Sequence, residues 1–157
     1  MAGRVDYYHD PDAPSANNIV VAVTAFIQDP AGRLLMIRRT DNNLYTIPGG
    51  AQEIGEKISQ TVIREVQEET RILVEVAELI GVYSDPKHVI AFADGEVRQE
   101  FALCFRARPI RGEPRTSIES KEVLWVEPTK LNELNIHPSI TLRIQHGFKQ
   151  RAKPFYA

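Results

Sequence analysis

The 157-residue sequence predicts a layered domain of the α+β or α/β class. Two observations support this prediction: stretches rich in β-branched residues recur along the chain, and two segments space their apolar residues as helices do. The sequence is 43% hydrophobic and 25% charged, so a chain of this length can bury a substantial core without disulfides. We expect an N-terminal arm over residues 1–18 and a single domain over residues 19–157.

The first elements of this domain are expected to be strands. Ile19–Gln28 is rich in β-branched residues, which favour an extended backbone. The turn residues Asp29–Gly32 separate it from a second extended stretch, Arg33–Arg39, and we therefore expect the two stretches to form a hairpin. A short extended piece, Tyr45–Ile47, then runs into Pro48–Gly50, where we expect a turn.

A helix is expected over residues 57–71, because apolar residues recur there at helical spacing. Its apolar side comprises Val62, Ile63, Val66 and Thr70. The carboxylates of Glu65, Glu68 and Glu69 fall on an adjoining face, since residues three and four apart are neighbours on a helix. The helix is therefore expected to bury one side and to hold these acids at the edge of the core.

The second half of the chain is expected to alternate strands with short connections and to end in a helix. The expected elements are strands at Ile72–Tyr83, Val97–Ala107 and Val123–Val126, a loop at Asp85–Gly95, a short turn or helix at Thr129–Leu134, and a terminal helix at Ser139–Lys149.

Charge and sequence composition argue against several classes of protein. The net charge of −2 lacks the basic excess of a general nucleic-acid binder. The one cysteine, Cys104, lies in an apolar run and is expected to be a small buried side chain. The start of the chain is polar and the apolar stretch Ile19–Ile27 is too short to span a membrane. We therefore expect a cytoplasmic protein without a membrane partner.

The acidic cluster predicts a divalent-metal site. Three carboxylates on one helix face repel one another unless a cation lies among them. Clustered glutamates without histidine or cysteine suit Mg²⁺ or Mn²⁺ better than Zn²⁺.

This cluster belongs to a longer pattern. Gly50 is followed by Glu56 after five residues, by Arg64-Glu65 after seven more, and then by Glu68-Glu69. The pattern resembles the Nudix box, the signature of hydrolases that act on a nucleoside diphosphate linked to another group. Arg71 stands where that family has glycine, a residue suited to the left-handed conformation that ends many helices.

The resemblance implies a fold and an activity. The implied fold is an α/β/α sandwich with a mixed central β-sheet, and the implied reaction is Mg²⁺- or Mn²⁺-dependent hydrolysis of a diphosphate linkage. ADP-ribose, an ordinary or oxidised nucleoside triphosphate and a dinucleoside polyphosphate all stay open as the small-molecule substrate. A homodimer is also implied. The alternatives are a catalytically silent nucleotide-sensing module and a non-nucleotide diphosphate hydrolase or isomerase.

The same resemblance implies roles for the residues of the box. The implied metal ligands are Glu56, Glu65, Glu68, Glu69 and a backbone carbonyl of Gly49 or Gly50. Among them Glu65 and Glu69 are the principal ligands, and Glu68 either ligates or positions water. Arg64 is expected to orient a glutamate through a charge-assisted hydrogen bond.

Further candidates lie outside the box, because such enzymes recruit an additional acid as base or extra ligand. The acids considered are Asp94, Glu96, Glu100, Glu119 and Glu122, of which we favour Glu100 and Glu119. Arg98 and the pair Arg38-Arg39 are candidates for phosphate contacts. His88 is a candidate for stacking on, or hydrogen bonding to, a base.

Overall fold

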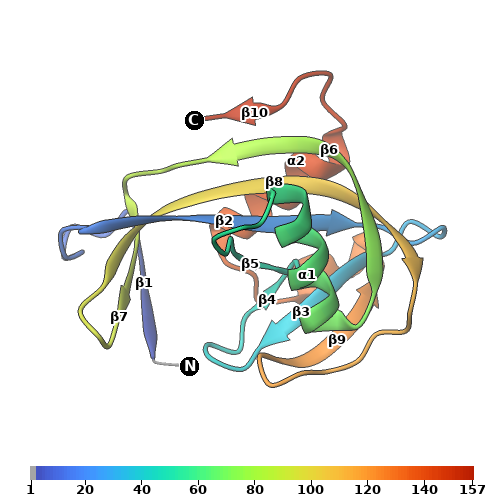
Figure 1. The fold of residues 1–157 in the computed structure, drawn as a ribbon, viewed down its shortest axis with the longest axis horizontal. Helices are drawn as coiled ribbons and strands as arrows, with labels where there is room; N and C mark the ends of the chain where they lie inside the picture. The colour runs from blue at the N-terminus through green and yellow to red at the C-terminus, as the bar shows by residue number, and fades with distance from the viewer. Residues whose placement is uncertain (1–2) are drawn as a thin grey trace.

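The computed structural model describes residues 3–157 and arranges them in two sheets and two α-helices (Figure 1). The seven-stranded sheet comprises β1 (Arg4–Tyr8), β2 (Asn18–Ile27), β5 (Gly49–Ala51), β6 (Leu73–Tyr83), β7 (His88–Phe92), β8 (Val97–Arg111) and β10 (Phe155–Tyr156). The three-stranded sheet comprises β3 (Leu34–Arg39), β4 (Tyr45–Thr46) and β9 (Ser120–Val126). The helices are α1 (Ile58–Thr70), α2 (Pro138–Lys149) and the 3₁₀ helix η1 (Pro128–Glu133). Within residues 3–157, none of the helices has the length and apolar character needed to cross a membrane.

Strand β8 is the centre of the larger sheet. It pairs in parallel with β2, from Asn18 opposite Arg98 to Ile27 opposite Ala107. Along its other edge it pairs antiparallel with β7 and then with β6, so the sheet is mixed. The short strand β5 pairs antiparallel with β2 and directly precedes the segment that leads into α1.

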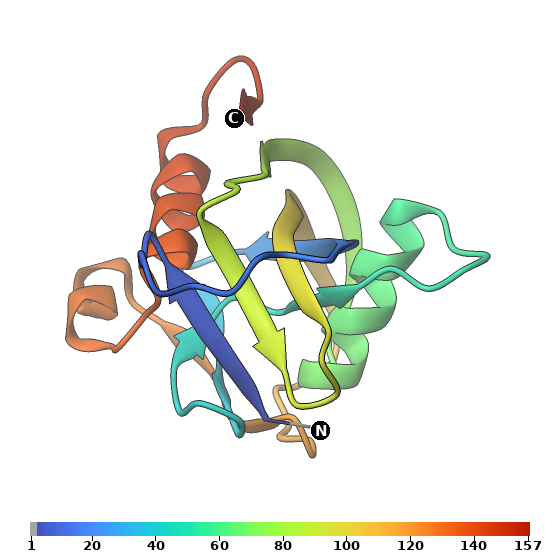
Figure 2. The same cartoon turned by 90° about the vertical axis from the view of Figure 1, so that its left-hand side faces the viewer.

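Helices cover both faces of these strands, as Figure 2 shows with α1 in green and α2 in red on opposite sides. Successive side chains of a strand point to opposite faces, and β2 illustrates the result. Phe26 packs in the core cluster beneath α2, whereas Ala25 and Ile27 pack in the cluster beneath α1. A strand buried on both faces has a nearly continuous apolar run, which explains the composition of β2. The predicted α/β/α sandwich with a mixed sheet is confirmed.

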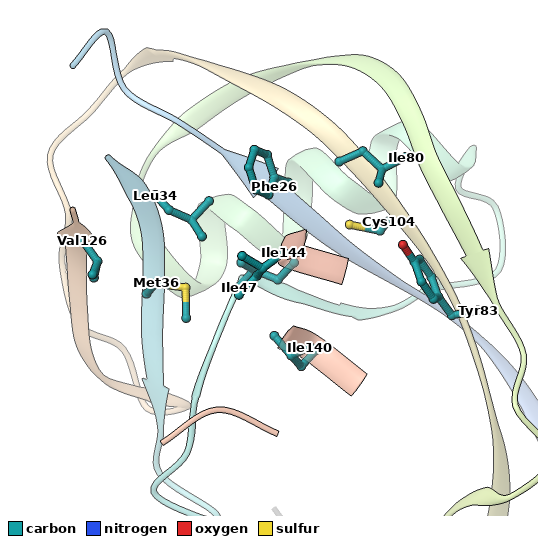
Figure 3. Packing of buried hydrophobic residues seen from close by; sticks show 10 residues of the cluster. All are labelled: Phe26, Leu34, Met36, Ile47, Ile80, Tyr83, Cys104, Val126, Ile140 and Ile144. Atoms are coloured by element: carbon teal, nitrogen blue, oxygen red, sulfur yellow. The ribbon is translucent and has the colours of Figure 1, made fainter. Parts of the chain in front are cut away.

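The cluster beneath α2 joins both sheets to that helix (Figure 3). Its buried members are Phe26, Leu34, Met36, Ile47, Ile80, Tyr83, Cys104, Val126, Ile140 and Ile144. The cysteine is fully buried among them, as expected.

The predicted hairpin is wrong. The turn Asp29–Gly32 forms, with the Gly32 N–H donating to the Asp29 carbonyl at 2.9 Å, but β2 and β3 diverge after it into different sheets. Only a bridge between Gln28 and Leu34 joins the two ends within the described residues. Each strand finds a more distant partner, β8 for β2 and β9 for β3.

Three other expectations about the backbone are also corrected. Residues 4–8 of the expected arm form β1, which pairs antiparallel with β7, while residues 1–2 lie outside the described part. Residues 88–92 of the expected loop form β7, whose first three residues are buried. Gly49 and Gly50, expected in a turn, belong to β5.

Helix α1 ends where the sequence places the unusual arginine. Arg71 adopts the left-handed conformation with φ 66°, and its N–H donates to the Gln67 carbonyl at 2.9 Å. The helix therefore ends as a glycine would end it, at a conformational cost of about 1–2 kcal/mol for a residue with a Cβ.

Candidate active site

The acidic face of α1 packs against strand β5. A Cβ atom at Gly50 would overlap with the carboxylate of Glu65, and one at Gly49 would overlap with the Val23 carbonyl of β2. Glycine at these two positions therefore lets the backbone of β5 approach both the sheet and the helix closely. This approach places the Glu65 carboxylate directly on the strand.

Arg64 organises three of the glutamates. Its Nε donates to Glu56 Oε2 at 2.6 Å and its Nη2 donates to Glu56 Oε1 at 3.0 Å. Its Nη1 lies 2.8 Å from Glu65 Oε1 and 3.3 Å from Glu68 Oε2, and Nη2 also donates to the Ala51 carbonyl of β5 at 3.0 Å. One guanidinium thus links the loop before α1, the helix and strand β5.

These contacts hold Glu56 as an anion. The hydrogen bonds from Arg64, together with the one from the Glu53 N–H, lower the pKa of Glu56 to about 2. Glu68, by contrast, has a side chain that is 58% exposed. Its contact with Arg64 is therefore that of a solvated pair of the kind contributing less than about 1 kcal/mol.

Glu69 is the most deeply buried acid of the cluster, with 4% of its surface exposed. Its Oε1 accepts a hydrogen bond from the Gly49 N–H at 2.9 Å. Burial raises the pKa of Glu69 to about 8; the hydrogen bond from Gly49 opposes this shift, and the nearby charge of Glu65 adds to it. The pKa of Glu65, which is 9% exposed, is also raised by burial, against the lowering effect of Arg64.

The pair Glu65 and Glu69 fits a divalent cation. Both carboxylates are buried, and burial raises the pKa of each. Their oxygens are the hard donors that Mg²⁺ and Mn²⁺ prefer. Within residues 3–157, no three Asp, Glu, His or Cys side chains converge as a ready-made metal site. Arg64 occupies oxygens of Glu56, Glu65 and Glu68 instead.

A cavity of about 340 Å³ opens beside this pair and extends to strands β1, β7 and β8 and to helix α2. Several residues expected to function line it, namely Gly49, Glu65, Glu69, His88, Arg98, Glu100 and Glu119. Its dimensions suit a small organic ligand, since such sites have volumes of roughly 300–1,000 Å³.

The arginines predicted to contact phosphates are each paired with an acid. Arg39 lines the cavity and is paired with Asp41 at 2.6 Å. Because successive side chains of a strand point to opposite faces, the adjacent Arg38 of β3 points away from the cavity. Arg38 instead lies 3.4 Å from Glu122. Of the predicted pair Arg38-Arg39, Arg39 is therefore the one that lines the cavity, and its contact with a phosphate stays a prediction. Arg98 lines the cavity but is held by Glu96 through two hydrogen bonds of 2.8 and 3.0 Å.

Other cavity residues were not singled out from the sequence. They are Arg4, Asp6, His137, Ser139 and Arg143, among others. The first two belong to the segment expected to be an arm. One signal was present for Arg143, because it lies between Ile140 and Ile144 on the apolar side of the terminal helix, where a charged residue is unusual.

Glu119 is positioned next to the carboxylate pair. It precedes β9, and the adjacent Ser120 Oγ donates to the Glu69 backbone carbonyl at 2.7 Å. The carbonyl of Glu119 accepts a hydrogen bond from the Thr40 N–H at 3.1 Å. The charge of Glu119 contributes to the raised pKa of both Glu65 and Glu69, which shows that the three acids share one electrostatic environment.

Comparison with known proteins identifies relatives over most of the chain. The family model described as "NUDIX domain" matches residues 18–144. The chain is 41% identical over 121 residues to a MutT-like protein of Streptomyces ambofaciens, covering 77% of this chain and 71% of the relative. It is 31% identical over 122 residues to an ADP-ribose pyrophosphatase of Methanocaldococcus jannaschii, covering 73% of this chain and 65% of the relative. The crystal structure of a NUDIX hydrolase from Nitrosomonas europaea aligns with a TM-score of 0.71 and 24% identity, covering 90% of this chain and 77% of that one, and it supports the fold alone.

Proposed function

The chain belongs to the NUDIX domain family and is a pyrophosphohydrolase, and from that premise we propose that it uses Mg²⁺ or Mn²⁺ to hydrolyse a nucleoside diphosphate derivative. The family resemblance predicted from residues 50–72 is confirmed by the match over residues 18–144. The relative from Methanocaldococcus jannaschii is an ADP-ribose pyrophosphatase, which keeps ADP-ribose among the candidate substrates beside nucleoside triphosphates and dinucleoside polyphosphates.

One observation carries the proposal. Glu65 and Glu69 are buried side by side on the wall of a ligand-sized cavity, with the pKa of each raised by burial. Burying carboxylates without sufficient positive charge costs several kcal/mol, so a fold that needed only stability would not retain this arrangement. A cation bound there would neutralise the carboxylates and attract the anionic diphosphate.

Glu65 and Glu69 would hold the cation, with Glu56, Glu68 and the Gly49 carbonyl as further candidate ligands. When bound, Mg²⁺ or Mn²⁺ supplies charge neutralisation at the diphosphate oxygens and lowers the pKa of a bound water. The Gly49 N–H fixes one Glu69 oxygen through the bond of 2.9 Å, so the other oxygen stays available for ligation.

Arg64 acts as a positioning residue. It is held from both sides by Glu56 and by the Ala51 carbonyl, and its remaining nitrogen fixes Glu65 Oε1 at 2.8 Å. A guanidinium with several fixed partners restricts its own rotamers and those of the carboxylates it binds. Arg64 thereby keeps Glu65 against Gly50 and toward the cavity.

We assign the role of general base to Glu119 in preference to Glu100 or Glu68. Glu119 lines the cavity, and its neighbour Ser120 donates a hydrogen bond to the Glu69 backbone carbonyl; Glu68 is not among the described residues that line the cavity. Its carboxylate accepts the proton of a water whose oxygen attacks a phosphorus of the diphosphate. The bond between that phosphorus and the bridging oxygen then breaks, and the bonding electron pair stays on this oxygen, which leaves as part of the other phosphate.

Two alternatives are less well supported. A catalytically silent nucleotide sensor has no use for a complete set of acids around Arg64, all of which are present. A non-nucleotide diphosphate hydrolase or isomerase shares the same cluster and differs only in the rest of the cavity. We further propose that the protein is cytoplasmic and forms a homodimer. Light scattering of the purified protein tests the oligomeric state.

The test is a phosphate-release screen of nucleoside triphosphates, ADP-ribose, nucleotide sugars and dinucleoside polyphosphates with Mg²⁺ and Mn²⁺. We expect Glu69→Gln to lower kcat at least roughly 100-fold with the fold intact by circular dichroism, in line with the loss of a main electrostatic contribution. Glu75→Gln is the matched control, because Glu75 on β6 lies in a pair whose side chains are 54% and 67% exposed. Unchanged turnover in Glu69→Gln would refute the assignment.

A further inference from the structure

Arg143 of α2 is a buried cation without adequate partners. It is 3% exposed, and its Nε has no hydrogen-bond partner among the described residues. Its Nη2 lies 3.9 Å from Glu100 Oε1, which is too long for a hydrogen bond. Its guanidinium carbon lies 5.0 Å from the centre of the Tyr83 ring. A buried guanidinium in this state is costly unless a ligand completes its hydrogen bonds.

Among the described residues, Arg143 differs from the other arginines of the cavity because its side chain makes no hydrogen bond to an acid. The Nε of Arg4 also lacks a partner, but its Nη2 donates to Asp6 at 3.0 and 3.2 Å. Arg39 and Arg98 are each held by an acid through two hydrogen bonds of 3.0 Å or less. Arg143 also lines a second cavity of about 240 Å³, and Glu100 lines both cavities with it. Arg143 and Glu100 thus present donors and acceptors side by side on a shared wall, and neither satisfies the other.

The surroundings of this wall suit a flat ring. His88 and His137 lie nearly parallel, with ring centres 5.0 Å apart and planes inclined by 12°, and both line the large cavity. Asp6 contacts His88 Nε2 at 3.3 Å, and the His137 Nδ1 lies 2.8 Å from Ser139 Oγ. The two imidazoles are therefore fixed in orientation. Burial lowers the pKa of His137, so this ring is neutral at neutral pH.

The charges around Arg143 argue against an anionic ligand. The cations facing this part of the cavity are Arg4 and Arg143, and the anions are Asp6 and Glu100. An additional phosphate here would meet two carboxylates. A neutral group that offers both acceptors and donors would satisfy Arg143 and Glu100 together.

We propose that Arg143 and Glu100 determine base specificity by hydrogen bonding to the two adjoining polar edges of the nucleobase, and that they favour guanine. This inference rests on the proposed function, because it places the nucleoside of the same substrate on the α2 side of the cavity. An arginine fork donates to O6 and N7 of guanine, while the N1–H and the N2 amino group of guanine are donors that a carboxylate accepts. Adenine offers an amino donor in place of the O6 acceptor, so it cannot satisfy both side chains equally.

The decisive experiment measures kcat/KM for GTP, ITP and ATP with Mg²⁺. The wild type is expected to prefer GTP over ITP, which lacks the N2 amino group, and over ATP, each by roughly 10-fold or more. Glu100→Gln is expected to abolish the preference for GTP over ITP and to retain ATP hydrolysis. Arg143→Lys keeps the charge but loses the planar fork, and it is expected to abolish the preference for GTP over ATP.

Arg108→Met is the control, because Arg108 is on the same strand as Glu100 with a side chain that is 67% exposed. It should leave the GTP preference unchanged. Circular dichroism establishes whether Arg143→Lys is folded, and Glu100→Gln keeps the inference falsifiable if it is not.

The outcomes separate the inference from the proposed function. Equal wild-type rates on all three substrates would overturn the inference and leave the hydrolase proposal standing. A uniform fall of Glu100→Gln on every substrate would also overturn it, since Glu100 would then act on the diphosphate chemistry common to all. If no substrate is hydrolysed, calorimetry with guanosine, inosine and adenosine monophosphates in chelator decides the inference alone. Tighter binding of the guanosine compound, lost in Glu100→Gln, supports it, and equal binding overturns it.

Discussion

The burial of Glu69 has a consequence for stability that activity assays do not report. With the metal removed by a chelator, the pKa of Glu69 is about 8 in the folded protein because burial disfavours its charge, against about 4.3 for an unperturbed glutamate in the unfolded chain. Between these values the folded state holds one proton more than the unfolded state. Stability must therefore fall as the pH rises through this window.

The size of the effect follows from the two pKa values. A difference of more than three pKa units corresponds to on the order of 4–5 kcal/mol, since each unit is worth about 1.4 kcal/mol. About 1 kcal/mol of this penalty is present at pH 5, and about 4.5 kcal/mol is present at pH 8. Glu69→Gln removes the ionisable group while its amide oxygen can still accept the Gly49 N–H bond. The substitution should therefore stabilise the metal-free protein progressively with pH.

Urea unfolding of the wild type, Glu69→Gln and the control Glu75→Gln in chelator, from pH 5 to 8.5, measures this difference. The wild-type and Glu75→Gln curves should decline together, while the Glu69→Gln curve should be flatter by several kcal/mol over the range. Saturating Mg²⁺ should restore most of the lost wild-type stability at high pH, because a ligand of the native state stabilises it. Parallel declines of the wild type and Glu69→Gln would refute the reasoning.

Two further predictions concern the backbone around the site. Gly50→Ala would force only the flexible end of Glu65 to move, so the midpoint of thermal unfolding should change by a few degrees at most. The kcat should fall roughly 100-fold, because the proposed metal-ligating carboxylate of Glu65 is displaced by about 1 Å. Unaltered kcat would contradict this prediction. Arg71→Gly should stabilise the protein by about 0.5–1 kcal/mol in urea, as relief of the left-handed strain at φ 66° exceeds the entropic cost of glycine; a loss of stability would show that the Arg71 side chain contributes more than that strain.

The fold was predictable where the signal is local. The helix over residues 57–71 was found within one residue of α1 at each end, because its periodicity and its ends are encoded in the segment itself. Strand pairing was not predictable, because it depends on distant partners. The same Asp29–Gly32 turn serves a hairpin or, as here, two diverging strands. The short apolar run of β7 was hidden between the turn residues around Pro86 and Gly95.

The candidate site divides in the same way. The acids of the box share one helix and one preceding loop, so their proximity follows from spacing alone, and Arg64 meets them as expected for a residue of that helix. The other wall of the cavity is assembled from β1, β8 and α2. Arg143 and Glu100 are brought together only by the packing of α2 against the sheet, for which no short motif exists.

The cluster separates into two electrostatic classes, and this separation explains why it contains more acids than a cation needs. Glu56 is ionised and neutralised by Arg64, whose own pKa is raised by that bond, so the pair contributes fixed geometry and little net charge. Glu69 is buried with a raised pKa and contributes affinity for a proton or a cation. Glu65 belongs to both classes, since Arg64 holds one of its oxygens while burial raises its pKa. Substitution of Glu56 should therefore act by disordering Arg64 and Glu65, whereas substitution of Glu69 acts through charge.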